Sequence, residues 1–353
     1  MADPIVFGLD PGNSEATGVV APSGKGSVLT IPSDIGAGSL RELTRIRGGS
    51  GQHVRLDPGE YVLEVDGSSA FVGTLALEQS AHASTARGDV RRYWSGHTLR
   101  LLMVLAGTLV NEATFTVRIV TGLPVKVWDN ESTVPQVQRS LCGTHQFVLN
   151  RQPRVMHVAG VMVVMEGGGA LAVHGLAEDV PQAVIDIGGR TTELFWAHGQ
   201  RPVLPRCTGF ERGVGDVADA LATWFLTQHG RELAPRELRN VLWSYVQRKP
   251  HQPIFVDTRP IQIADAVARC VREIGEDIRS RISRAWRSSE HGKVAADAAR
   301  VLAIGGGPYY FAPLLREMLP RLEVPKHAEV ANAQGDFAIG QQLPERVWAR
   351  LHP

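Results

Sequence analysis

The feature that most constrains the fold is a motif that occurs twice, once near the N-terminus and once at about the middle of the chain. Each copy is an apolar run followed by Asp-x-Gly and polar residues: "IVFGLDPGNSEAT" carries Asp10, and "AVIDIGGRTTEL" carries Asp186. Strand-like sequence follows each motif, so each predicts a hairpin tip at the end of a buried strand. Two similar halves with alternating strands and helices predict an α/β fold, with a ligand cleft between the halves.

Taken alone, the second motif has two interpretations, a tight hairpin or a turn that wraps an anion. Glycines allow close backbone approach, and successive N–H groups in such a turn form a concave anion site. The hydroxyls of Thr191 and Thr192 add possible donors. Asp186 would repel a phosphate unless a cation lies between them, most simply hydrated Mg²⁺.

Apolar periodicity predicts the other elements. We expect a strand over 5–9, a β-rich insertion over 35–92, and a buried helix over 97–113. Further expected elements are strands over 115–125 and 299–307, strand–turn–helix over 157–176, and helices over 214–230, 235–249, 261–289 and 313–322. The arginine-rich run 279–287 has interleaved glutamates nearby, which favours a solvated helix face or a contact between protein copies over a nucleic-acid patch.

Composition excludes several classes of protein. The net formal charge is +1, so no bulk attraction to nucleic acid or to an anionic membrane is expected. Cys142, Cys207 and Cys270 are scattered, with neither zinc-binding spacing nor a disulfide framework. No apolar run approaches a membrane span, and the N-terminus lacks the pattern of a signal peptide. These features predict a cytoplasmic protein.

Three stretches, in this order along the chain, carry a family resemblance. "GLDPGNSEAT", "VIDIGGRTTEL" and "VLAIGGGPYYF" resemble the two phosphate hairpins and the adenosine loop of the actin, sugar-kinase and heat-shock chaperone ATPase superfamily. Within it, "IVTGLPV", "VMVVMEGGGAL", "ERGVGDVADAL" and "ANAQGDFAIG" are similar to bacterial and archaeal actin-like proteins of the ParM type.

The resemblance implies an actin-like fold of two similar α/β domains around a nucleotide cleft. Domain I would comprise residues 1–180, with the small insertion at 35–92 and the segment 335–353 returning to it. Domain II would comprise residues 181–334, with a small insertion at about 231–262.

The resemblance also implies roles for individual residues. Glu166 would orient the attacking water, and Asp10 and Asp186 would hold Mg²⁺ through water, these three being the catalytic residues. The nucleotide-binding residues would be Gly12, Asn13, Ser14, Gly188, Gly189, Arg190, Thr191, Thr192, Gly215, Gly305, Gly306, Gly307, Pro308 and Tyr309. Phosphoryl transfer needs mostly positioning and charge neutralisation, which these residue types can supply.

The sequence departs from the family pattern at several positions. Thr17 stands where actin and ParM usually have a lysine, and Pro11 removes one backbone donor from the first turn. Arg190 stands where glycine is common, and it either reaches the phosphates or points to solvent. Tyr309 either stacks on the purine or packs in the core, and Glu237 lies on a helix that contacts the nucleotide in some relatives.

The implied function is an ATPase that forms filaments with ATP (or GTP) and Mg²⁺ and disassembles after hydrolysis. Its expected partners are other copies of itself, in a head-to-tail filament, and a DNA-binding adaptor in plasmid segregation or intracellular positioning. Direct binding to DNA or to a membrane is not expected. Two alternatives remain, an exopolyphosphatase-type phosphohydrolase and a non-hydrolysing nucleotide-binding scaffold.

Overall fold

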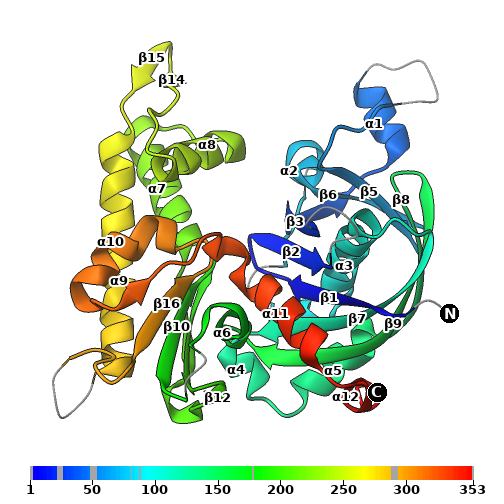
Figure 1. Cartoon of the computed structure of the whole chain (residues 1–353). Coiled ribbons are helices and arrows are strands. Elements are labelled where there is room, and N and C mark those ends of the chain that lie inside the picture. Colours follow the sequence, from blue (N-terminus) through cyan, green and yellow to red (C-terminus); the bar gives the residue numbers. More distant parts are fainter. Residues whose placement is uncertain are drawn as a thin grey trace. The chain divides into compact units, whose positions relative to one another are not determined.

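The computed structural model describes residues 3–21, 27–47, 54–80, 82–86, 89–176, 179–287 and 293–351. These residues form two compact units. Unit 1 contains the described residues up to His174 together with those from Val330 onward, and unit 2 runs from Gly175 to Glu329. Unit 1 is therefore built from both ends of the chain, whereas unit 2 is one continuous segment (Figure 1).

Unit 1 contains a nine-stranded sheet in the order β3-β2-β1-β7-β9-β8-β5-β6-β4. Strand β1 pairs in parallel with β7, and β7 pairs in parallel with β9, while the other neighbours are antiparallel. The strands are β1 (Ile5–Asp10), β2 (Glu15–Val20), β3 (Ser27–Pro32), β4 (Ile35–Ala37), β5 (Glu60–Val65), β6 (Ser68–Gly73), β7 (Thr114–Leu123), β8 (Gly143–Leu149) and β9 (Gln152–Met165).

Helices cover both faces of the central strands of unit 1. Phe7 and Leu9 belong to a fully buried core that includes residues of α3, whereas Gly8 between them faces α11, because strand residues alternate between faces. A Cβ at Gly8 would lie 2.2 Å from the carbonyl oxygen of Ala333, so α11 lies directly on the backbone of β1. The helices are α1 (Leu40–Ile46), α2 (Thr74–Gln79), η1 (Val90–Trp94), α3 (Gly96–Leu109), α4 (Val125–Trp128), α5 (Thr133–Leu141), α6 (Gly168–His174), α11 (Ala331–Gln342) and α12 (Glu345–Trp348).

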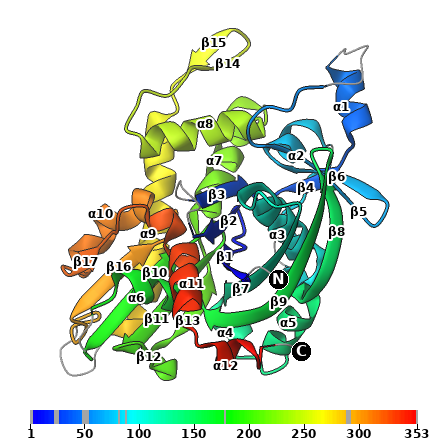
Figure 2. The same ribbon diagram turned by 45° about the vertical axis from the view of Figure 1, so that its right-hand side comes forward.

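The segment 35–92, predicted as a β-rich insertion, contains β4, β5 and β6 together with α1 and α2, and its strands are part of the main sheet. The hairpin β5–β6 joins the main sheet because β8 turns back along β9 and pairs on its other edge with β5. Figure 2 shows β8 and β9 as the long ribbon that carries this connection. A small core of its own, which includes Leu43, Phe71 and Leu75, supports α1 and α2.

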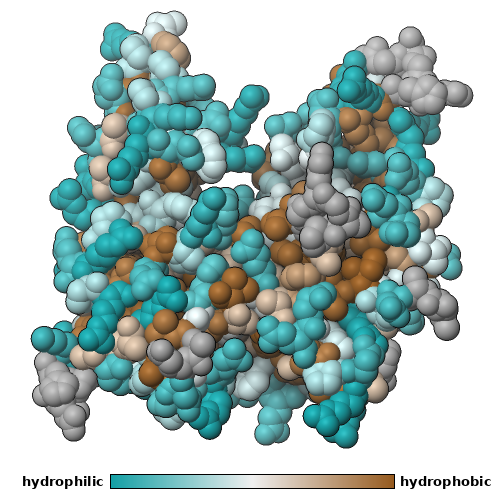
Figure 3. Space-filling view, in the orientation of Figure 1, coloured by the Kyte–Doolittle hydropathy of each residue, from teal (hydrophilic) through white to brown (hydrophobic). Residues whose placement is uncertain are grey.

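Unit 2 contains a sheet in the order β12-β11-β10-β16-β17, with β13 paired to β11, and a separate hairpin of β14 and β15. Trp196 and Trp286 pack edge to face in its core, with ring centroids 5.4 Å apart. The surface of this unit seen in Figure 3 is mostly hydrophilic, with scattered apolar residues, as is usual for a folded surface. Its elements are β10 (Pro181–Ile187), β11 (Thr191–His198), β12 (Arg201–Pro202), η2 (Leu204–Arg206), β13 (Thr208–Glu211), α7 (Val214–His229), α8 (Pro235–Val246), β14 (Ile254–Val256), β15 (Arg259–Ile261), α9 (Ala264–Trp286), β16 (Arg300–Ile304), α10 (Pro308–Met318) and β17 (Leu322–Glu323), with η3 (Ala328–Val330) at the end of its sequence.

The predicted α/β class is confirmed, and most differences concern where helices begin and end. The helix expected over 97–113 ends at Leu109, because Val110 takes an extended conformation and leads toward β7. Helix α10 begins at Pro308, a residue well suited to a first helical position, rather than at 313. The stretch "ANAQGDFAIG" lies within α11. None of the helices in the described ranges is both long and apolar enough to cross a bilayer.

Candidate functional site

The first Asp-x-Gly motif forms the turn between β1 and β2, and its oxygen atoms are bound from one side. The Gly12 carbonyl accepts hydrogen bonds from Ser33 Oγ (2.7 Å) and from the Arg92 guanidinium (2.8 Å). Arg92 also donates to Asn13 Oδ1, and the Ser33 N–H donates to the Ser14 carbonyl (3.0 Å). The amide N–H that follows a carbonyl points to its opposite side in a trans peptide, so the Asn13 N–H is directed away from Ser33 and Arg92. The first turn therefore directs the Asn13 N–H away from the side chains that bind the Gly12 carbonyl.

Asp10 and Glu166 lie at the same edge of the sheet in unit 1. Asp10 ends β1, and Glu166 directly follows β9, with β7 between and parallel to both. The carboxyl ends of parallel strands are the usual location of ligand sites in α/β sheets. The Glu166 N–H donates to the Leu123 carbonyl (2.8 Å), and a Cβ at Gly122 would lie only 3.1 Å from Glu166 Cγ. Gly122 thus gives the Glu166 side chain room at the end of β7.

The second Asp-x-Gly motif forms the turn between β10 and β11, and backbone groups of α7 hold it. The carbonyls of Gly188 and Gly189 accept from the N–H groups of Val214 (3.0 Å) and Gly215 (2.6 Å). By the same peptide geometry, the N–H groups of Gly189 and Arg190 are directed away from α7. A Cβ at Gly213 would lie 2.5 Å from the Gly188 oxygen, so the close approach requires glycine.

Two side chains of the second turn have partners within unit 2. Arg190 pairs with Asp219 and lies 4.0 Å from Asp216, both on α7. Thr192 is completely buried, and its hydroxyl donates to the Arg212 carbonyl (2.8 Å). In this structure Arg190 is therefore turned toward α7, and Thr192 supports the base of the turn.

The predicted adenosine loop contacts the strand that carries Asp186. Because β10 and β16 are parallel and Asp186 pairs with Ile304, Gly305 follows at the same sheet edge. Gly305 has a positive φ of 79°, and a Cβ there would lie 2.6 Å from Asp186 Oδ1. The Gly307 N–H donates to the Ile187 carbonyl (2.8 Å), and Pro308 then begins α10. Unit 2 thus brings together Asp186, the second turn and the glycine loop.

Tyr309 lies beside this loop with 43% of its surface exposed, and its hydroxyl donates to Glu329. Burial of the phenol and the Glu329 carboxylate raise the pKa of Tyr309 to about 12, so it stays protonated. Tyr310 stacks on Tyr245 instead, with ring centroids 5.9 Å apart. Glu237 binds Arg231 (2.8 Å) and the Ala234 N–H (2.9 Å), and thus caps the start of α8.

Sequence analysis missed the residues that support the two turns. Ser33 and Arg92 lie about 20 and 80 residues from the first turn, and no local pattern marks them. Thr17, which replaces a family lysine, is buried, and its hydroxyl hydrogen-bonds that of Thr30 (2.9 Å). Its side chain therefore links β2 to β3. Gly213 could have been recognised, because it immediately precedes a predicted helix next to the predicted Gly215.

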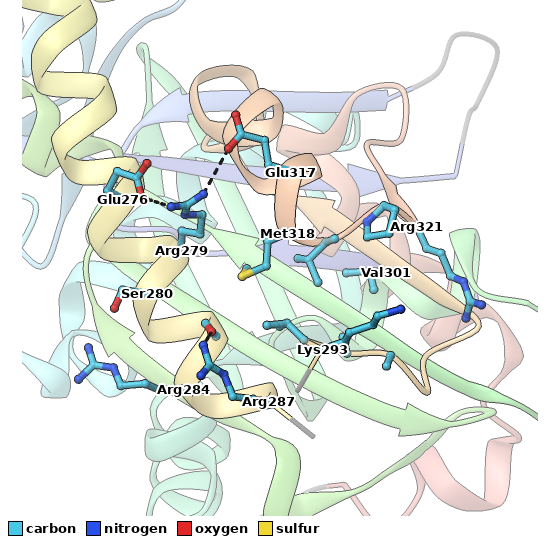
Figure 4. A pocket seen from close by; sticks show the side chains of 16 residues that line it. Glu276, Arg279, Ser280, Arg284, Arg287, Lys293, Val301, Glu317, Met318 and Arg321 are labelled. Carbon is cyan, nitrogen blue, oxygen red and sulfur yellow. Dashed lines mark hydrogen bonds and ion pairs between the residues drawn. The ribbon is translucent and has the colours of Figure 1, made fainter. Parts of the chain in front are cut away.

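A hollow of about 1280 Å³ in unit 2 is separate from these groups (Figure 4). It is lined by the end of α9, the start of β16 and the end of α10, and it includes none of the predicted nucleotide-binding residues. Arg279 there binds both Glu276 (2.8 Å) and Glu317 (3.2 Å). Arg279, Arg284 and Arg287 of the arginine-rich run therefore line this hollow. Arg281 instead pairs with Asp277 and lies over the ring of Phe210.

The residues present fit an anion that is held together with a hydrated cation. Outward N–H donors suit phosphate oxygens, and carboxylates such as Asp10 and Asp186 are ligands that Mg²⁺ accepts while keeping several waters. The glycine at 305 lets the loop pass within van der Waals distance of Asp186, which leaves no room for a side chain there.

Comparison with known protein families gives two matches. Residues 8–169 match the N-terminal domain of actin like proteins, and residues 184–317 match the C-terminal part of the archaeal actin homologue MreB-like family. No curated protein matches the sequence.

Solved structures of actin homologues share the fold at low sequence identity. The archaeal actin homolog Ta0583 is 18% identical with a TM-score of 0.77, over 96% of this chain and 100% of that one. A ParM from a 15-stranded Clostridium botulinum filament is 17% identical with a TM-score of 0.76, over 97% and 100% of the two chains. The actin-like protein Alp7A is 15% identical with a TM-score of 0.71, over 99% and 98%. The fold is thus actin-like, as predicted, and the chain belongs to the actin-like proteins.

Proposed function

We propose that this protein is an Mg²⁺-dependent ATPase that assembles into filaments with ATP and disassembles after hydrolysis. The observation that carries the proposal is the pair of turns that direct backbone donors outward, each directly after a strand that ends in or contains an aspartate. The related archaeal homolog Ta0583 has been crystallised with ADP, which supports a nucleotide as the ligand.

The residues of this chain divide the binding task. The first turn (Gly12, Asn13 and Ser14) and the second (Gly188 to Thr191) would donate to phosphate oxygens. Asp10 and Asp186 would hold Mg²⁺ through water, and bound Mg²⁺ supplies neutralisation of phosphate charge. Gly305, Gly306, Gly307, Pro308 and Tyr309 would contact the nucleoside. Thr192 and Gly215 would hold the second turn in shape.

Glu166 would orient the attacking water rather than bind the nucleotide. Its position at the end of β9, at the same sheet edge as Asp10, supports this role. A water-positioning carboxylate need not be a strong base to contribute to in-line attack.

Filament formation is part of the proposal, because the ParM of similar fold is known in a 15-stranded filament. Head-to-tail contacts between copies that do not close into a ring would extend into a filament. We propose a role in plasmid segregation or intracellular positioning in the cytoplasm, through an adaptor protein that binds the DNA.

The test is to follow phosphate release and sedimentation together, with ATP, GTP, ADP, polyphosphate or no nucleotide. We expect hydrolysis and pelleting with a nucleoside triphosphate and no turnover of polyphosphate. Glu166→Ala should slow hydrolysis by roughly two to four powers of ten while binding survives, so that filaments persist longer. Glu131→Ala, at an exposed position of the same unit, is the control. Polyphosphate turnover without ATP or GTP turnover would favour a phosphohydrolase, and hydrolysis without pelleting would leave a monomeric ATPase.

A further inference from the structure

Arg92 is a buried cation in direct contact with the first turn. It belongs to η1, only 2% of its surface is exposed, and its guanidinium binds the Gly12 carbonyl (2.8 Å) and Asn13 Oδ1. The Arg92 carbonyl accepts from the Thr98 hydroxyl (2.7 Å), which fixes η1 to the start of α3. The backbone of Arg92 is therefore fixed by Thr98, and its guanidinium is fixed by the turn.

These contacts orient two donors of Asn13. With the Gly12 carbonyl directed at Arg92, the Asn13 N–H of the same peptide plane points the other way. With Asn13 Oδ1 also directed at Arg92, the side-chain NH₂ group points away from it too, because the carboxamide is planar. Arg92 thus sets the direction of one backbone and one side-chain donor.

The charge of Arg92 also matters to the first hairpin. Residues 5–20 contain the carboxylates Asp10 and Glu15 and no lysine or arginine. An arginine side chain stays charged under all ordinary conditions, so Arg92 brings a permanent positive charge within hydrogen-bonding distance of this turn.

We propose that Arg92 is the positioning residue that makes the first turn an anion-binding site. It acts through Gly12 and Asn13, and its guanidinium charge favours a polyphosphate on the outer side of the turn. This inference rests on the proposed nucleotide-binding function and identifies a residue on which that function depends.

The experiment compares Arg92→Met, Arg92→Lys and Ser33→Ala with a matched control, Arg154→Met. Arg154 also lies in unit 1 and donates to two backbone carbonyls, those of Asn111 (3.0 Å) and Glu112 (2.9 Å), but not to the turn. Calorimetric titration with Mg²⁺-ATP is combined with thermal unfolding in the absence of nucleotide.

We expect Arg92→Met to weaken Mg²⁺-ATP binding roughly ten- to hundredfold, the value of losing charge-assisted hydrogen bonds. Arg92→Lys should recover part of the affinity by restoring the charge, and Ser33→Ala should cause a smaller loss. Arg154→Met should lower the unfolding temperature without changing the affinity, which separates positioning from general stability.

Three results would overturn the inference, and they differ in what they say of the proposed function. If the wild type binds Mg²⁺-ATP and the Arg92 variants bind it equally well, Arg92 has no positioning role and the proposed function stands. If the wild type binds neither ATP, GTP nor pyrophosphate, both proposals fail together. Should Arg92→Met fail to fold, wild-type affinity in both Arg92→Lys and Ser33→Ala decides against the inference.

Discussion

The two Asp-x-Gly turns have the same motif but different supports. In the first turn, the side chains of Ser33 and Arg92 bind the carbonyl oxygen of Gly12. In the second turn, two N–H groups at the start of α7 bind the corresponding carbonyls of Gly188 and Gly189. Both arrangements direct the following N–H groups outward. The comparison shows that one local geometry can depend either on distant polar side chains or on the backbone of an adjacent helix. We therefore expect different substitutions to disrupt the first turn and the second turn.

The largest effect should come from replacing the aspartate that each of the two motifs contains. Asp186→Ala should weaken Mg²⁺-ATP binding by several kcal/mol and metal-free ADP binding much less, because the carboxylate acts through the ion. Asp10→Ala should weaken Mg²⁺-ATP binding by a similar amount if the two turns contribute equally to the affinity. Calorimetric titration with and without Mg²⁺ measures the loss in each variant. Asp129→Ala, at an exposed position, is the control. Unchanged Mg²⁺-ATP affinity in both variants would remove the nucleotide interpretation.

The second turn should be sensitive to the addition of one methyl group. Gly213→Ala would place a Cβ 2.5 Å from the Gly188 oxygen and 2.8 Å from the Arg190 nitrogen, both backbone atoms that cannot rotate away. We expect a loss of up to about 3 kcal/mol in the free energy of unfolding, the usual range for overpacking, together with weaker nucleotide binding. Gly96→Ala is the control, because a Cβ there has no neighbour within 4 Å among the described residues. A stable Gly213→Ala variant with full affinity would contradict the backbone-support model of this turn.

The first turn should be sensitive to acid, because His97 lies near its supports. Burial and the nearby charge of Arg92 lower the pKa of His97 to about 4, against about 6.5 in an unfolded chain. The unfolded state then binds the proton more readily, so stability is lost as pH falls below about 6.5. This loss should reach about 2 kcal/mol between pH 7 and pH 5, measured by urea unfolding. His97→Gln should remove that slope, and an identical slope in the variant would show that another group is responsible.

The smallest effect should come from Arg190, which is turned toward α7. The Asp219 side chain of this pair is 59% exposed, so Arg190→Ala should change the free energy of unfolding by less than about 1 kcal/mol. We also expect little change in ATP affinity, because the guanidinium is directed at carboxylates. Asp219→Ala, which releases Arg190, is the companion variant. A loss of affinity greater than about tenfold in Arg190→Ala would show that this side chain reaches the ligand, and that both turns depend on an arginine.

The two hairpins and the glycine loop could be predicted from sequence because their signals are local. Each combines an apolar strand with an Asp-x-Gly or a glycine run, and the parallel pairing of β10 with β16 then places Gly305 beside Asp186. Ser33 and Arg92 could not be predicted, because a hydrogen bond to Gly12 from 80 residues away leaves no periodic pattern. The partners of Arg190 and Thr192 depend in the same way on where α7 and β13 pack. The pairing of β5 with β8 could not be predicted either, because the local sequence of a strand does not specify which strand it pairs with.

The close contact of α11 with β1 has a consequence for synthesis of the protein. Unit 1 combines β1 with α11, a helix that is synthesised after the whole of unit 2, whereas unit 2 is continuous. Gly8 in β1 and Gly169 in α6 are both covered by α11, whose Gly335 would place a Cβ only 1.9 Å from the Gly169 oxygen. At ordinary elongation rates of about 5–20 residues per second, roughly 15 seconds to a minute pass between the synthesis of β1 and that of α11. Unit 2 can fold as soon as it has been synthesised, but the strand that carries Asp10 becomes fully packed only after α11 has followed unit 2.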